Sequence, residues 1–292
     1  TVVVEEMLHL SLAANMLNAV GGTPCLTAAD FVPKYPTALP DGEKDFRVHL
    51  RRFSRQAIET FLKIERPSKA PDQASQRRAQ PAAAELADPM RLHHLRLHFY
   101  SIGEFYAEIE RGIEELVGRH GESNVFTGDP AKQATSEYYY SGGGELIPVY
   151  DLAAANAAIE LISEQGEGHV RNIYDDEGEL AHYYRYDQLI RGRYYQPGDQ
   201  PHKPSGPALT VDWDASYPVM QNPRKKAFGK GELYNAAVGF NRSYAQFLAL
   251  LTRAYNGQPQ LLLDAVPQMF HLRDQITQLI RNPIPGMEGV NA

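Results

Sequence analysis

The chain has 292 residues, of which 43% are hydrophobic, so it is long enough to bury a sizeable core. Its net charge of −7, without a long block of lysine or arginine, argues against a nucleic-acid partner. Cys25 is the only cysteine and no apolar run approaches membrane-spanning length, so we expect no intrachain disulfide, no membrane partner and a reducing, cytoplasmic compartment.

The first predicted helix runs from Val2 to Val20 and stops at Gly21-Gly22, a glycine signal typical of helix ends. At about 100° per residue, Glu6 and His9 lie near the centre of one apolar face. The apolar residues of this face are Val2, Leu12, Ala13, Met16, Leu17 and Val20, and the opposite face, expected in water, carries Ser11, Asn15 and Asn18. The helical pattern is already under way at Thr1 without a capping residue, so we expect that a preceding segment is missing.

The next segment is predicted to be mostly irregular. Residues 23–45 are rich in proline and form a loop, and Phe46, Val48 and Leu50 alternate like a short strand. Ser54 is placed to cap a helix that ends at Glu65. Residues 67–90 are rich in Pro, Ala, Gln and Ser, a composition that predicts a mobile excursion.

The middle of the chain returns to helix. A long apolar stripe predicts a helix from Arg91 to Val117, and residues 119–150 are predicted to form loop or short strands. Asp151 then opens an alanine-rich helix that reaches Gln165, whose small side chains allow a neighbouring helix to come close. A further helix is expected from Glu179 to Arg191.

The C-terminal third contains a long Pro/Gly/Lys loop at residues 196–231, followed by two helices at about 232–255 and 261–281. Asn256-Gly257 separates these helices, so residues 232–281 are predicted to form a helical hairpin packed on the core. No internal repeat is evident. We therefore expect residues 1–292 to form a single, mainly α domain.

Two copies of Glu-x-x-His are the most informative motif, at Glu6 to His9 and at Glu179 to His182. The second pair is expected to share a face with a set of apolar and aromatic residues, namely Tyr183, Tyr186, Leu189 and Ile190. A buried carboxylate needs a counter-charge or a metal. Two such helices, with one carboxylate from each of two others, predict a pair of metal ions inside a helix bundle.

The donor chemistry favours iron, with manganese or zinc also suitable, because a neutral imidazole beside a carboxylate suits these ions better than calcium or magnesium. The competing interpretation of either motif is a local Glu–His hydrogen bond on a partly wet surface. A shared site requires His9 and His182 to lie within about 12 Å of each other.

Several separated motifs resemble one known family. They are Glu5-Glu6-Met7-Leu8-His9 followed by Ala-Ala-Asn-x-Leu-Asn-Ala-x-Gly-Gly, Ile-Gly-Glu-Phe-Tyr at 102–106, Glu-Gln-Gly-Glu-Gly at 164–168, and Glu-Leu-Ala-His-Tyr-Tyr-Arg at 179–185. These residues resemble the ferritin-like proteins related to iminophenyl-pyruvate dimer synthases, which serve violacein- and rebeccamycin-type natural product biosynthesis. The resemblance implies a ferritin-like four-helix bundle and oxidative coupling of two arylpyruvate imines.

The resemblance also implies carboxylate ligands beyond the two motifs. One would come from a helix upstream of Thr1. For the other, Glu104 and Glu164 both lie in family-like motifs, and we prefer Glu164 slightly because it borders an alanine-rich apolar face, whereas Glu104 lies roughly opposite the main apolar stripe of its helix. For each of them the alternative is a solvated helix glutamate.

Other residues are weaker candidates. His94 and His98 are spaced like metal ligands but are interpreted as surface histidines. Glu5 is a candidate outer partner for His9. Tyr183, Tyr184 and Tyr186 flank His182 and are usually packing residues at such positions. The loop that carries Trp213 either covers a substrate pocket or braces the C-terminal hairpin.

The combined prediction is a dinuclear, di-iron oxidoreductase that uses dioxygen to oxidise a small organic substrate such as an amino-acid-derived imine. Glu6, His9, Glu179 and His182 would be its catalytic metal ligands, with Glu164 or Glu104. A homo-oligomer is compatible with this prediction. The alternatives are an iron-binding or storage protein without enzyme activity, and a helical binding module without metal; a pocket beside the metals would favour the enzyme.

Overall fold

The structure is a computed structural model, and it describes residues 2–39, 46–68, 99, 101–139, 142–168, 172–175 and 177–292. Helices dominate these residues, and the extended pairings among them are isolated bridges. The elements are α1 (Val2–Ala19), α2 (Arg55–Ile64), α5 (Ile102–His120), α6 (Glu122–Val125), η1 (Pro130–Lys132), η2 (Ser136–Tyr138), α7 (Leu152–Glu167), α8 (His182–Arg191), η3 (Lys225–Phe228), α9 (Glu232–Ala254) and α10 (Leu261–Ile280). The mainly α fold class is confirmed.

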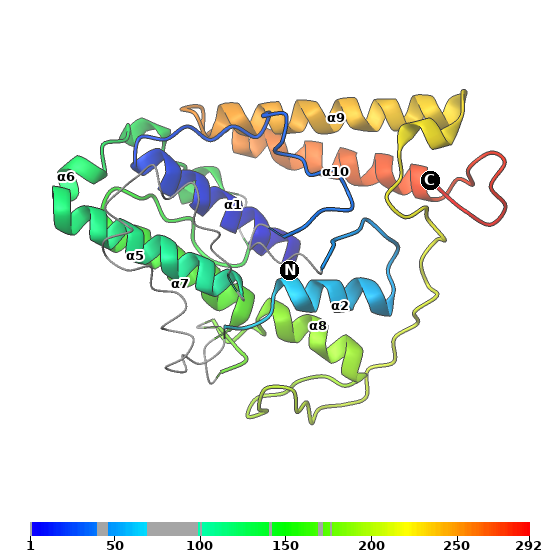
Figure 1. Ribbon diagram of the computed structural model, residues 1–292, viewed down its shortest axis with the longest axis horizontal. Helices are drawn as coiled ribbons and strands as arrows, with labels where there is room; N and C mark the ends of the chain where they lie inside the picture. Colours follow the sequence, from blue (N-terminus) through cyan, green and yellow to red (C-terminus); the bar gives the residue numbers. More distant parts are fainter. Residues whose placement is uncertain are drawn as a thin grey trace.

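The helices pack in pairs around α1 (Figure 1). α9 and α10 form the long C-terminal hairpin along one edge, as predicted, and α5 runs against α7 on the other side. α2 and α8 form a third pair, and α7 contacts both α1 and α8. This arrangement brings the N-terminal half of α1 toward the α2–α8 pair.

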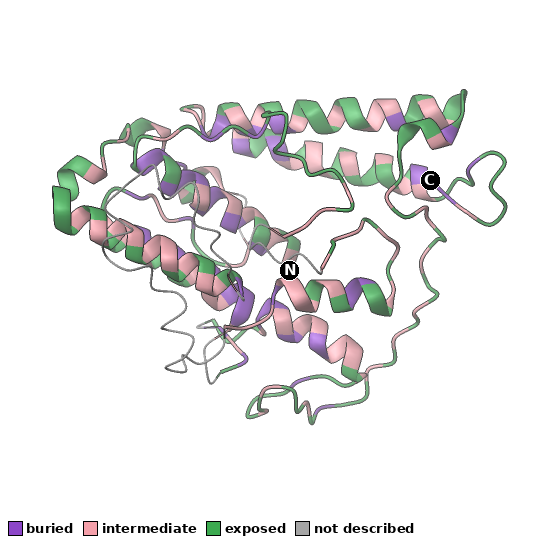
Figure 2. Ribbon diagram, in the orientation of Figure 1, coloured by how far each residue is buried: buried purple, intermediate pink, exposed green. Residues whose placement is uncertain are grey.

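The main hydrophobic core joins α1 and α7 to the adjoining ends of α9 and α10. Its residues with 0% exposed surface include Leu8 and Leu12 of α1, Ala155 and Ala158 of α7, and Ala254 of α9. Figure 2 shows buried residues along much of α1, whereas the outer sides of α9 and α10 are exposed. Helix α1 is therefore the central element of the fold.

The interpretation of Ser11, Asn15 and Asn18 as a wettable face is wrong, because all three are buried. The Asn15 carboxamide donates to the carbonyl oxygens of Ala134 and Ile147 and accepts from the Ala134 N–H. Asn18 donates to the carbonyl of Tyr255 at 2.7 Å. Small polar side chains thus bind the backbone of segments that cover α1. Leu17, which was expected on the buried face, is 43% exposed.

Two predicted helix starts are confirmed. Ser54 caps α2 by accepting a hydrogen bond from the Ala57 N–H, and Asp151 caps α7 by accepting from the Ala154 N–H. A hydroxyl or carboxylate oxygen at this position satisfies one of the otherwise unpaired amide groups of the first helical turn. Glu65, the residue after α2, adopts a non-helical conformation and closes that helix.

Between residues 46 and 150 the structure differs from the prediction in three places. α5 begins at Ile102, where Ser101 caps it, and Phe99 is not helical, so the helix expected from Arg91 is shorter in its described part. The expected strand at 46–50 is reduced to one antiparallel bridge between Thr37 and Val48. Residues 119–150, expected as loop or strands, contain α6, η1 and η2. Most of the predicted excursion at 67–90 lies outside the described residues.

In the described part of the chain, the helices lack the combination of length and apolar character that a bilayer crossing requires.

Candidate metal centre

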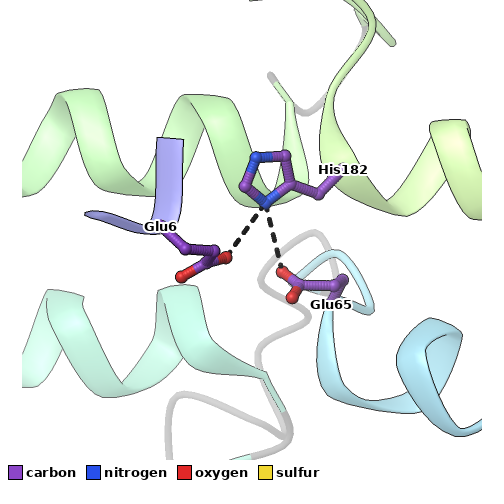
Figure 3. A group of neighbouring side chains, drawn as sticks. All are labelled: Glu6, Glu65 and His182. Carbon is purple, nitrogen blue, oxygen red and sulfur yellow. Dashed lines mark ion pairs between the residues drawn. The ribbon is translucent and has the colours of Figure 1, made fainter. Parts of the chain in front are cut away.

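Three side chains from three different helices meet where α1 approaches the α2–α8 pair. Glu6 comes from the first turns of α1, Glu65 from the C-terminal end of α2, and His182 from the first residue of α8 (Figure 3). His182 Nδ1 lies 3.2 Å from Glu6 Oε1 and 3.8 Å from Glu65 Oε2. One ligand atom from each residue lies within 4.8 Å of the others, a spacing that would admit a metal ion.

His182 is the centre of this group and is 1% exposed. Its Nε2 faces Glu5 Oε2 at 2.8 Å. Among the described residues its Nδ1 has no hydrogen-bond partner, although the carboxylates of Glu6 and Glu65 flank it. A buried ring nitrogen without a hydrogen-bond partner is unusual and requires a physical explanation.

His9 lies beside this group on the next turn of α1. Its ring centroid is 5.6 Å from that of His182, so the predicted proximity of the two histidines is confirmed. His9 Nδ1 lies 3.5 Å from Glu6 Oε2, and its Nε2 lies 2.9 Å from Gln165 Oε1 on α7. Glu6 therefore presents one carboxylate oxygen to the Nδ1 atom of each histidine.

The carboxylates determine the charge state of His182 in the metal-free protein. Burial alone would lower the pKa of His182, but Glu5, Glu6 and Glu65 outweigh it and raise this pKa to about 11. His182 is therefore a cation at neutral pH when no metal is bound. It lies among the carboxyl groups of Glu5, Glu6 and Glu65, and Arg185 adds a second positive charge beside Glu5.

The three carboxyl groups respond differently to this cation. Partial burial would raise the pKa of Glu6, but His182 and His9 lower it to about 2. The pKa of Glu5 is also lowered, because His182 and Arg185 outweigh its burial. Burial and the charge of Glu6 instead raise the pKa of Glu65. Solvent reaches 47% of the Glu6 side chain, so its ion pairs are partly screened.

Another buried carboxylate, that of Glu167, anchors the chain next to Glu65. Glu167 is 7% exposed and accepts hydrogen bonds from the N–H and the hydroxyl of Ser68 and from the N–H of Gly103. Ser68 Oγ also lies 2.7 Å from Ser101 Oγ. Because Ser68 follows Glu65 by only three residues, this contact restrains the chain that carries Glu65.

The second Glu-x-x-His motif is not on one helix face as expected. α8 begins at His182, so Glu179 precedes the helix, in a turn where Tyr174 bridges Leu180. The Glu179 side chain is 54% exposed and its carboxylate pairs with Arg185 at 2.6 Å. The structure therefore brings His182, but not Glu179, to the centre.

The fourth-helix carboxylates are also placed elsewhere. Glu104 lies in the first turn of α5 and Glu164 near the end of α7, and both are half-buried outside the group of potential ligands. The carboxylate that completes the group is Glu65, for which the sequence predicts only a position at a helix end. Its one sequence signal was an acidic residue directly after the apolar positions of a short capped helix.

The weaker candidates from the sequence have different outcomes in the structure. Glu5 contacts His182 rather than His9, which corrects its expected partner. Trp213 stacks on Phe53 with ring centroids 5.3 Å apart, so this part of its loop lies against the start of α2. Phe228 of η3, near the end of the same loop, packs in a buried cluster with Ala237 of α9 and Leu279 of α10, so the loop also braces the C-terminal hairpin. His94 and His98 lie outside the described residues.

The tyrosines around α8 pack through contacts between their rings. Tyr186 stacks on Phe61 of α2, with ring centroids 5.1 Å apart. Tyr183 and Tyr184 contact each other edge to face. Burial, with added repulsion from Glu65 and Glu6, raises the pKa of Tyr186 to about 12, so its phenol stays protonated at neutral pH.

A groove of about 410 Å³ opens between α5 and α7. Its lining combines apolar surface with the carboxylates of Glu110, Glu160 and Glu164. Glu167 also lines it, and the preceding residue, Gly166, lies beside Glu65: a side chain there would begin 3.6 Å from Glu65 Oε2. The groove therefore reaches the same turn of α7 that contacts the candidate metal centre.

Comparisons with known proteins agree with this architecture. Dichlorochromopyrrolate synthase from Lentzea aerocolonigenes is 26% identical over 298 aligned residues, which cover 95% of this chain and 26% of that protein. The chain thus spans about a quarter of the length of this relative. No solved structure matches significantly. The family model described as ferritin-like matches residues 1–191, which contain α1 through α8 and all the residues of the candidate metal centre, and the chain therefore belongs to the ferritin-like family.

Proposed function

We propose that this chain is a ferritin-like oxidoreductase that binds two metal ions, preferably iron, and uses dioxygen to oxidise a small organic substrate. One observation carries the proposal: the two oxygens of Glu6 face the Nδ1 atoms of two different histidines, at 3.2 Å for His182 and 3.5 Å for His9. A carboxylate in this position is placed to bridge two ions.

The hydrogen bonds of the two rings fit metal binding. With His182 neutral, Nε2–H donates to Glu5, so the lone pair of Nδ1 points between Glu6 and Glu65. With His9 neutral, Nε2–H donates to Gln165, so its Nδ1 lone pair points toward Glu6. The Nδ1 atom of His182, which has no hydrogen-bond partner in the described part of the chain, would then be a ligand atom.

The donor set of imidazole nitrogen and carboxylate oxygen suits iron, manganese or zinc better than calcium or magnesium. Glu6, Glu65, His9 and His182 would hold the ions, and bound iron would supply the activation of dioxygen. Glu6 and Glu65 would neutralise the positive charge of the ions, and Glu5 would orient His182. Glu179, Glu104 and Glu164 are not assigned as ligands here.

The chemistry around the cluster suits an oxidase. Burial raises the pKa of the Tyr106 phenol, and nearby Glu6 adds to the effect. Tyr106 and Tyr186 therefore remain neutral hydrogen-bond donors near the carboxylates at neutral pH. Such donors can hold a polar substrate or take part in proton movement without adding charge.

The similarity to dichlorochromopyrrolate synthase supports a biosynthetic role and, more specifically, the coupling of two amino-acid-derived imines. The groove between α5 and α7 provides room for a small molecule next to the turn of α7 that contacts Glu65, which favours an enzyme over a storage protein. Its mixed lining of apolar surface and glutamates suits an organic substrate that carries hydrogen-bond donors.

The test combines metal analysis with oxygen uptake. The chain is loaded with Fe(II) without oxygen, desalted and analysed, and is then mixed with the imine that an amino-acid oxidase produces from tryptophan. We expect two iron ions per chain and dioxygen consumption that depends on the imine. The His182→Gln variant should lose both, whereas His271→Gln, at an exposed position of α10, should keep both.

Either of two results would overturn the proposal. One is a folded, iron-loaded chain that consumes no more dioxygen with the imine than without it. The other is equal iron content in the His182→Gln and unmodified proteins. Uptake of many iron ions per chain would instead indicate storage.

A further inference from the structure

Gln165 connects the two halves of the candidate centre. This residue of α7 is 2% exposed. Its Nε2 donates to the Gly143 carbonyl oxygen at 2.5 Å, and its Oε1 faces His9 Nε2 at 2.9 Å. An amide nitrogen donates and a carbonyl oxygen accepts, so the contact with Gly143 fixes which end of the amide faces His9. His9 Nε2 must then carry the hydrogen.

The position of the Gly143 carbonyl is itself fixed by close packing. Gly143 has a φ of +74°, which favours glycine, and a side chain there would begin 2.4 Å from Glu5 Cγ. The loop can therefore approach α1 only because residue 143 has no side chain. The same glycine lies against Glu5, the partner of His182, and accepts from Gln165, the partner of His9.

The two histidines differ in the charge of these partners. Glu5, which contacts His182, has a carboxyl group, and Gln165, which contacts His9, has a neutral amide. A carboxylate that accepts from the outer nitrogen of an imidazole raises the basicity of the inner nitrogen, and a neutral amide does so less. His182 also faces two carboxylates, Glu6 and Glu65, whereas for His9 the corresponding ion pair is with Glu6.

We propose that Gln165 is a positioning residue that holds His9 in the tautomer with Nδ1 toward Glu6, and that its neutral amide makes the His9 position the weaker of two metal positions, filled second. This inference rests on the proposed function. It adds an order in which the two metal ions bind. It also assigns to Gln165, which is not a ligand, the control of metal affinity at the His9 position.

The experiment is a competition titration with Zn(II) alone against a chromogenic chelator. For the unmodified chain we expect two ions and two distinct affinities. Gln165→Leu keeps much of the volume but can neither accept from His9 nor donate to Gly143. It should weaken the second affinity by about 10- to 100-fold, the usual effect of removing an outer partner, and leave the first unchanged.

Gln133→Leu is a matched control. Gln133 is 4% exposed, donates to the Asn15 carbonyl and accepts from the Val149 N–H. Its replacement therefore removes a buried amide of the same kind that contacts neither His9 nor His182. It should reduce stability and leave both affinities in place. Glu5→Gln gives the reciprocal change: it should weaken the first affinity and bring the two closer together.

The tautomer can be read in the unmodified protein by a long-range proton–nitrogen NMR spectrum with labelled histidine. In the unmodified protein we expect the ring hydrogen of His9 to lie on Nε2. In Gln165→Leu we expect that this single tautomer is no longer held. A hydrogen on Nδ1 of His9 would overturn the inference, as would Gln165→Leu affinities that match those of Gln133→Leu. A chain that binds no zinc would instead overturn the proposed function and the loading order, and the spectrum would still decide the positioning role of Gln165.

Discussion

Metal binding at His182 should displace a proton, and the number released follows from the structure. Glu5, Glu6 and Glu65 outweigh burial and raise the pKa of His182 to about 11, from an ordinary value of 6.5. At about pH 8 the metal-free ring is therefore almost fully protonated, whereas an ordinary histidine would carry only about 0.03 proton. A metal needs the Nδ1 lone pair, so the first ion should release about one proton.

The linkage also sets the pH dependence of affinity. For each pH unit below the raised pKa of His182, competition with the proton lowers the metal affinity about tenfold. The affinity for the first ion should therefore rise about 100-fold between about pH 6.5 and 8.5. The folding stability of the metal-free protein changes with pH in the opposite direction to the metal affinity. Stabilisation by the charged His182 is fully present below about pH 6.5 and is lost as the pH rises toward about 11.

The assay is a Mn(II) or Zn(II) titration followed with a pH indicator in weak buffer, and independently by calorimetry in buffers of different ionisation enthalpy. His271→Gln should release the same proton as the unmodified chain, because His271 is exposed on α10. His182→Gln should release almost none at the metal concentration that fills the first position. Tight binding to the unmodified chain with less than about 0.2 proton released would refute the charge state assigned to His182.

Three further predictions concern other residues. Glu65→Gln should lower metal content after dialysis, measured by elemental analysis, whereas Glu179→Gln should not, because Glu179 pairs with Arg185 at the surface; equal losses would contradict this placement. Glu167→Gln replaces the acceptor of three hydrogen bonds and should lower the free energy of unfolding in urea by about 1–3 kcal/mol, so an unchanged midpoint would refute its anchoring role. Asn15→Ala leaves buried backbone groups of the covering loop unpaired and should cost about 3 kcal/mol or more, with the metal affinity of any folded fraction retained.

The sequence predicted the helices with strong local signals. Ser54 and Asp151 begin helices because each has a short side chain that caps the first turn, and the C-terminal hairpin was predicted from two helical segments separated by Asn256-Gly257. Glu6 and His9 were found because they share a face of α1. These are local properties, and they need no knowledge of which helices become neighbours.

The parts that the sequence did not predict depend on long-range packing. Glu65 ends α2 and lies on no helical face, so periodicity gives it no direction; it reaches His182 only because α2 packs against α8. Glu179 has the right spacing from His182, but helix α8 begins after it. Asn15 was placed in water because polar residues usually are, whereas here its carboxamide binds loop backbone.

The central claim is that Glu6 lies between two metal ions, each bound by the Nδ1 atom of one histidine. Anomalous diffraction from crystals grown with Mn(II) or Fe(II) tests it most directly. We predict two peaks about 3.5–4 Å apart, one near Nδ1 of His182 and one near Nδ1 of His9, with an oxygen of Glu6 on each. Absence of peaks at Glu6, or peaks confined to the groove beside Glu164, would contradict the claim.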